Sequence, residues 1–121
     1  MLRRYLTRAL SWAGFDVVEA SNGHHAVELL ATESFDVVVS DVFMPDVTGV
    51  DIVRAARACT PSVPVVLVSG APTRNRAREA ARYGAADFLS KPFEFSVLED
   101  CLRRVVGVDL GRERLAPPSR R

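Results

Sequence analysis

Lysine is almost absent from this chain of 121 residues, although basic residues are common in it. Fifteen of the 16 basic residues are arginine, and the single lysine is Lys91. A compact ammonium fits a small site that a planar guanidinium does not, so one retained lysine indicates a position where that shape is needed. Chance can also leave one lysine in an arginine-rich sequence, so Lys91 is only a candidate.

The sequence also lacks any apolar run near the roughly 20 residues that span a bilayer, and it lacks the apolar block of a signal peptide. The formal net charge is only +1, which gives no electrostatic case for nucleic-acid or membrane binding. The two cysteines, Cys59 and Cys101, fall on apolar helix stripes and are expected to be buried thiols in a reducing compartment. We therefore expect a cytoplasmic protein with no membrane segment and no direct nucleic-acid contact.

What the sequence does contain is a regular alternation of helical and extended patterns. The predicted helices lie near 2–10, 24–33, 49–59, 73–83 and 96–106, and the predicted strands near 16–20, 37–41, 65–68 and 85–90. Runs of valine without alternation, as in 37–39 and 65–66, are typical of strands buried on both faces of a parallel sheet. The pattern predicts one α/β domain with a doubly wound parallel sheet in a three-layer αβα arrangement. Residues 107–121 lack periodicity and are expected to form a flexible tail.

Three of the predicted strands end in side chains that suit phosphoryl transfer, namely Asp41, Ser69 and Lys91. Parallel strands present their carboxyl ends on one edge of the sheet, so these side chains should meet. A carboxylate can attack phosphorus, while an ammonium and a hydroxyl bind phosphoryl oxygens. Each residue also has an ordinary interpretation as a turn or loop residue, but their coincidence on consecutive strand ends favours a site.

The order and spacing of these residues resemble the receiver domain of two-component response regulators, with a flavodoxin-like (CheY-like) fold. The resemblance covers residues 1–106. The matching residues are Asp41 with Met44-Pro45 and Gly49, then Ser69-Gly70-Ala71, then Gly84-Ala85 with Asp87-Phe88-Leu89 leading to Lys91-Pro92-Phe93.

The resemblance implies a role for each matching residue. Asp41 would be the phosphoacceptor in a phosphorelay, receiving its phosphoryl group from a sensor histidine kinase. Ser69 and Lys91 would contact that group, and a cis peptide would follow Lys91. Phe88 would occupy the switch position, although a plain core aromatic is the alternative. The backbone carbonyl of Phe43 and the Asp41 carboxylate would bind Mg²⁺. The protein would not be an enzyme, and its partners would be the kinase and a downstream protein target or output domain.

The sequence departs from the family pattern at its beginning. Receivers have five strands in the order 2-1-3-4-5, and the first ends in an acidic pair that binds Mg²⁺. In this chain the first acidic residue is Asp16. The first strand of the receiver pattern and its acidic pair are therefore both absent from the sequence. Mg²⁺ binding should therefore be weakened. A misplaced start, a fragment, or an N-terminally truncated receiver would each explain this, and an unpaired strand raises the expectation of a homodimer formed by strand exchange.

Rival functions differ in what they require of the sequence. Haloacid-dehalogenase-type phosphatases need a second aspartate two positions after the first, where this chain has Phe43. A nucleotide or flavin binder would need a glycine-rich phosphate loop, which follows none of the strands. The serious alternative is a truncated or degenerate receiver that acts as a phosphorylation-independent interaction module. Its candidate surface is the arginine-rich helix, with Arg74, Arg76, Arg78 and Arg82, and the last helix should carry Glu99–Arg103 and Asp100–Arg104 pairs.

Overall fold

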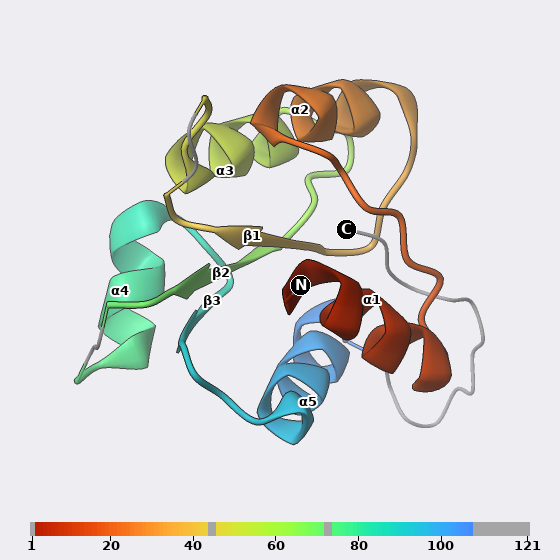
Figure 1. The fold of residues 1–121 in the computed structure, drawn as a ribbon. Helices are drawn as coiled ribbons and strands as arrows, with labels where there is room; N and C mark the ends of the chain where they lie inside the picture. Colours follow the sequence, from red (N-terminus) through yellow and green to blue (C-terminus); the bar gives the residue numbers. More distant parts are fainter. Residues whose placement is uncertain (1, 44–45, 72–73, 108–121) are drawn as a thin grey trace.

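The computed structural model describes residues 2–43, 46–71 and 74–107, with the side chains of residues 2–4 not described. From α2 onward, helices and strands alternate as the sequence predicts (Figure 1). In chain order, the elements are α1 (Leu2–Trp12), α2 (Gly23–Thr32), β1 (Val38–Asp41), α3 (Gly49–Arg57), β2 (Val65–Ser69), α4 (Arg76–Tyr83), β3 (Asp87–Ser90) and α5 (Phe95–Val106). Most of the predicted tail, residues 108–121, lies outside the described residues, as do Met44 and Pro45 of the motif.

The sheet has three parallel strands in the order β1-β2-β3. All five residues of the central strand β2 are buried, as expected for a parallel strand covered on both faces. This order is that of the last three strands in the receiver pattern 2-1-3-4-5.

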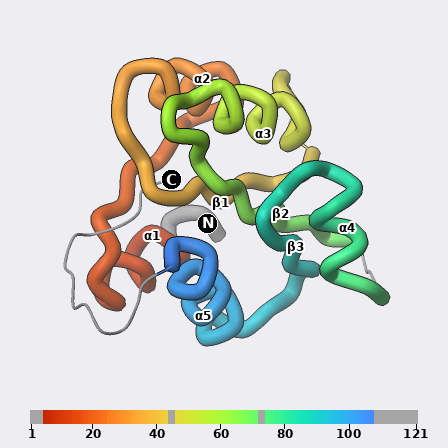
Figure 2. The backbone as a smooth tube through the Cα atoms, turned by 180° about the vertical axis from the view of Figure 1, so that it is seen from behind, coloured from red at the N-terminus to blue at the C-terminus, as the bar shows by residue number. Residues whose placement is uncertain are grey.

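Helices cover both faces of this sheet and form two separate apolar clusters. On one face, α2, α3 and α4 pack over Val38, Val65 and Leu67. On the other face, α1 and α5 pack over Val37 and Val66. Figure 1 shows α2 and α3 on the opposite side of the sheet from α1 and α5, and Figure 2 shows α4 beside β3 at the sheet's margin. The three-layer αβα architecture is therefore confirmed.

The predicted strand at residues 16–20 is wrong, because this segment joins no ladder of the described sheet. An extended segment becomes a strand only when a neighbouring backbone pairs with it, and β1, β2 and β3 are the strands of the described residues. The segment nevertheless packs, since Phe15 is buried in the α1–α5 cluster and Ala20 in the cluster on the opposite face. It therefore crosses from one layer to the other as a connection.

Helical spacing in the sequence also predicts inward faces that include Ala31 in α2 and a core stripe of Val97, Leu98, Cys101 and Leu102 in α5. Two of these positions are wrong, because Ala31 is exposed and Val97 is 38% exposed. Leu98, Cys101 and Leu102 do form the buried stripe of α5, as predicted. None of the described helices has both the length and the apolar composition needed to cross a membrane.

Candidate functional site at the carboxyl edge of the sheet

Asp41 is the last residue of β1 and lies at the carboxyl edge of the sheet, with its side chain 49% exposed. The chain then folds back tightly, and the Gly49 N–H donates a hydrogen bond of 2.7 Å to the Val42 carbonyl. A Cβ atom on Gly49 would lie 2.8 Å from the Asp41 carbonyl oxygen and 2.9 Å from the Val42 Cα. Only glycine fits at this position of the tight turn. The turn leaves the carboxylate of Asp41 open to solvent.

Lys91 follows β3 and reaches across the end of β2 to Asp41. Its Nζ lies 2.8 Å from Asp41 Oδ1, and its side chain is 33% exposed. Its backbone N–H donates to the Ser69 carbonyl at 2.7 Å, which fixes the start of this loop to the end of β2. The peptide between Lys91 and Pro92 is cis, as expected. The one lysine of the chain is therefore an ion-pair partner of Asp41.

Ser69 ends β2 and is buried, with only 6% of its surface exposed. Its hydroxyl oxygen accepts a hydrogen bond of 3.0 Å from the Ala71 N–H. Among the described residues, the Ser69 hydroxyl makes no hydrogen bond with the side chain of Asp41 or Lys91. The sheet therefore brings all three predicted strand ends to one edge, but only the carboxylate and the ammonium are in contact.

The two phenylalanines of the predicted site lie in opposite environments. Phe43 lies two residues after Asp41 in the chain, and it is 75% exposed. Phe88 is 4% exposed and stacks on Tyr83 of α4, with ring centroids 6.2 Å apart and an interplanar angle of 9°. Phe88 therefore points inward and contacts α4 in this structure.

Other acidic residues near Asp41 in sequence are engaged elsewhere. Asp46 accepts hydrogen bonds from the N–H groups of Val47, at 2.8 Å, and His24, at 3.3 Å. Asp51 completes a capping box with Thr48 at the start of α3. Across residues 2–43, 46–71 and 74–107, no three His, Cys, Asp or Glu side chains converge as a metal site. For Mg²⁺, the predicted ligands in this part of the chain remain the Asp41 carboxylate and the Phe43 carbonyl.

The family model for the response regulator receiver domain matches residues 1–103. The chain belongs to this family.

Curated relatives of this receiver include transcriptional regulators. The transcriptional regulatory protein CusR of Escherichia coli K12 is 38% identical over 94 residues, which is 78% of this chain and 41% of CusR. The response regulator protein FleR of Pseudomonas aeruginosa is 39% identical over 103 residues, or 85% of this chain and 22% of FleR. The receiver thus spans less than half the length of these relatives.

Solved structures of receivers share the same fold. FixJ-N has a TM-score of 0.75 and 29% identity, covering 90% of this chain and 89% of that one. The receiver domain of the sensor histidine kinase PA1611 from Pseudomonas aeruginosa PAO1 has a TM-score of 0.71 and 25% identity, covering 88% and 87%. The PA1611 structure holds a magnesium ion in its active-site cleft.

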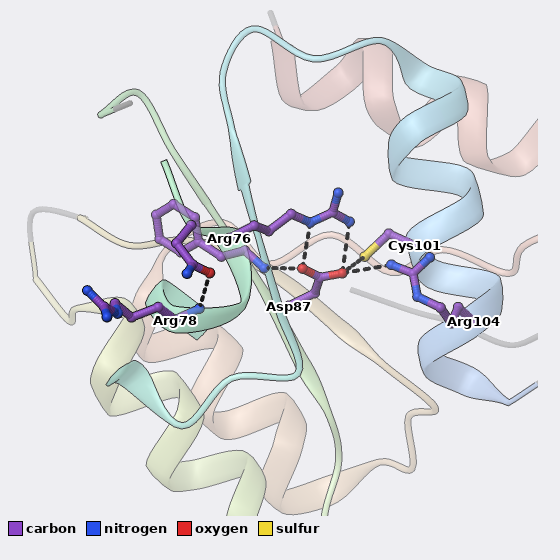
Figure 3. Close-up of polar contacts among 7 residues, drawn as sticks. Arg76, Arg78, Asp87, Cys101 and Arg104 are labelled. Atoms are coloured by element: carbon purple, nitrogen blue, oxygen red, sulfur yellow. Dashed lines mark hydrogen bonds and ion pairs between the residues drawn. The ribbon is translucent and has the colours of Figure 1, made fainter. Parts of the chain in front are cut away.

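A second polar centre of this receiver, which the sequence does not predict, lies on β3. We call Arg76, Asp87, Cys101 and Arg104 the Asp87 cluster (Figure 3). Arg76 donates to both carboxylate oxygens, at 2.7 and 2.8 Å, and Arg104 donates to Oδ2 at 2.8 Å. The Cys101 thiol also donates to Oδ2, at 3.2 Å. The predicted Glu99–Arg103 pair forms, at 2.8 Å. The prediction of an Asp100–Arg104 pair is wrong, because Arg104 binds Asp87 instead.

Hydrogen bonds and neighbouring charges keep the Asp87 carboxylate ionised. Burial alone would raise the pKa of Asp87, but hydrogen bonds from Arg76, the Phe88 N–H and Cys101 outweigh burial and hold this pKa well below its usual range. Burial, and then the neighbouring Asp87 carboxylate, raise the pKa of the Cys101 thiol to about 12. Cys101 is therefore an inert donor at neutral pH. The sequence signal that could have indicated the Asp87 cluster is an acidic residue at the start of an otherwise apolar strand in an arginine-rich chain.

Proposed function

We propose that this receiver accepts a phosphoryl group on the Asp41 carboxylate from a phosphohistidine of a sensor histidine kinase. The observation that supports this best is the 2.8 Å contact between Lys91 Nζ and an Asp41 carboxylate that is 49% exposed. An exposed carboxylate can approach phosphorus, and a fixed ammonium beside it stabilises the charge that develops on the phosphoryl oxygens. Asp41 is thus the proposed nucleophile, and Lys91 the proposed phosphoryl contact.

The transfer exchanges one bond to phosphorus for another. An Asp41 carboxylate oxygen attacks phosphorus in line, the new O–P bond forms, and the N–P bond of the phosphohistidine breaks. The departing imidazole recovers its electron pair and takes a proton from solvent. In this scheme, Lys91 moves from Asp41 Oδ1 toward the phosphoryl oxygens. Ser69 donates its hydroxyl to the same group, exchanging its present contact with the Ala71 N–H.

The proposed Mg²⁺ ligands are the Asp41 carboxylate and the Phe43 backbone carbonyl. Mg²⁺ commonly takes one or two carboxylates with water and phosphate oxygens, so this donor set is at the lower limit for the ion. Bound there, Mg²⁺ would neutralise phosphoryl charge. We propose that its affinity is weaker than in receivers with an acidic pair, because Asp46 and Asp51 are engaged in loop and helix-cap hydrogen bonds.

We also propose that Phe88 is the switch residue and that residues 1–106 form the receiver unit, followed by a tail at 107–121. The inward Phe88 ring lies against Tyr83, so a change at Ser69 that is passed along β2 and β3 would reach α4 through this stack. The downstream recipient is proposed to be a protein partner or an output domain. The proposals for Phe88 and for the downstream recipient depend on Asp41 being the acceptor.

The test is to incubate the chain with Mg²⁺ and acetyl phosphate and to measure the mass of the intact protein. One added phosphoryl group that is absent from Asp41→Asn would support the proposal. Absence of the adduct from a chain that circular dichroism shows to be folded would overturn it. The phosphorylation-independent interaction module would then be the better function.

A further inference from the structure

Helices α4 and α5 belong to different apolar cores of this domain. Ala80 and Tyr83 of α4 pack in the cluster that contains Phe88. Leu98 and Leu102 of α5 pack in the cluster on the opposite face of the sheet. The sheet separates these two cores, so apolar packing holds each helix to the sheet without joining one helix to the other.

The Asp87 carboxylate supplies a direct connection between the two helices. Arg76 is the first residue of α4 and binds both carboxylate oxygens, while Arg104, near the end of α5, binds Oδ2. Figure 3 shows the Arg76 guanidinium above the Asp87 carboxylate, while Arg104 reaches the carboxylate from α5 on the right. One carboxylate on β3 therefore receives donors from both helices.

The two arginines depend on each other because they share an acceptor. Arg76 Nη2 and Arg104 Nη2 each lie 2.8 Å from Asp87 Oδ2. The Asp87 side chain is only 12% exposed, whereas those of Arg76 and Arg104 are 40% and 59% exposed. Charge-assisted and bidentate contacts to a poorly hydrated carboxylate are strong and geometrically specific. When one guanidinium leaves, the remaining contacts and the carboxylate must readjust.

We propose that Asp87 couples α4 to α5, so that a change in one helix is transmitted to the other through this carboxylate. The position of the cluster relates this coupling to the Asp41 site. Helix α4 follows the loop after Ser69, and α5 follows the loop after Lys91, so the coupled helices are the ones that leave two strand ends of the Asp41 site. The coupling itself requires no phosphorylation, and its test is therefore independent of the proposed function.

Hydrogen–deuterium exchange of the full chain at neutral pH, followed by mass spectrometry of its peptides, tests the coupling. The variants Arg76→Gln and Arg104→Gln each remove one guanidinium. Arg78→Gln is the matched control, because Arg78 is on the same helix and its side chain points away from Asp87 (Figure 3). Peptides from α2 report on global unfolding, since α2 does not contact the cluster.

Coupling free energies act equally in both directions. We therefore expect Arg104→Gln to accelerate exchange in α4, and Arg76→Gln to accelerate exchange in α5, by about fivefold or more. The control should change neither, and α2 should exchange as in the wild type. The proposal is overturned if each substitution affects only its own helix, or if all peptides, including those of α2, accelerate equally.

Discussion

Asp41 and Asp87 are carboxylates of the same three-stranded sheet, but their surroundings are opposite. Asp41 ends β1 with its side chain 49% exposed, and within the described part of the chain Lys91 is its one ion-pair partner. Asp87 opens β3 with its side chain 12% exposed, and it accepts hydrogen bonds from two arginines, a thiol and the Phe88 N–H. One carboxylate is accessible to reagents, and the other is saturated with donors.

The difference shows how a domain separates reactivity from stability. A nucleophile needs oxygens that a substrate can reach, so most of its hydrogen-bonding capacity must be left to water or ligands. A structural carboxylate needs the reverse, because a buried charge is tolerated only when donors replace its hydration. The same substitution at the two positions should therefore have opposite consequences.

The largest expected effect is on phosphorylation by acetyl phosphate. Asp41→Asn should abolish the adduct, because the amide oxygen is a poor nucleophile, whereas Asp87→Asn should retain it because Asp87 is remote from the attacking atom. Intact-mass measurement over time gives the extent of modification for both variants. An adduct that persists in Asp41→Asn would place the acceptor elsewhere.

The next effect is on the free energy of unfolding. Asp87→Asn should lower it by about 3 kcal/mol, because charge-assisted hydrogen bonds from two arginines to a mostly buried carboxylate are lost. Asp41→Asn should change it by less than about 1 kcal/mol, as expected for an exposed pair. Urea denaturation of the three proteins makes the comparison. Equal losses for both variants would show that the two carboxylates do not differ in structural role.

A smaller effect is expected from Gly49→Ala, which tests how the fold presents Asp41. The added methyl group would approach the Asp41 carbonyl and the Val42 Cα too closely, and overpacking of this kind costs about 2 kcal/mol. The loss should appear in urea denaturation together with slower phosphorylation, because the loop after β1 must shift. Gly70→Ala is the control, since its Cβ would meet no atom within 4 Å. Similar losses in both variants would contradict the tight return of the chain at Gly49.

The smallest effect concerns the dependence of stability on pH. The pKa of Asp87 is lowered in the folded state, so its contribution is complete above about pH 4, the usual range of an unfolded aspartate. The contribution is lost as the pH falls below that range toward the folded-state pKa. The stability gap between the wild type and Asp87→Asn should therefore narrow in acid, by at most about 1.4 kcal/mol per pH unit for one proton. A gap that stays constant from pH 5 to pH 2 would contradict this assignment.

The sequence predicted the elements whose signal is local. Valine runs identified β1 and β2, helical periodicity identified the five helices, and strand ends identified Asp41 and Lys91 as neighbours. The prediction of a strand at 16–20 was wrong because a strand requires a neighbouring strand to pair with, and the local sequence pattern does not reveal that neighbour. The Asp87 cluster was missed because its members come from three elements. Helical spacing assigned Arg104 to Asp100, but tertiary contact with a poorly hydrated carboxylate prevailed over a solvent-exposed pair.

One hydrogen bond of Asp87 has a consequence for the margin of the sheet. β3 is an outermost strand, and its Phe88 N–H donates to Asp87 Oδ1 at 2.7 Å. Exposed strand margins recruit strands of other molecules through such N–H groups. Here the group is already satisfied, and the guanidinium groups of Arg76 and Arg104 lie beside it. The carboxylate that connects two helices thus also makes β3 a poor template for edge-to-edge aggregation.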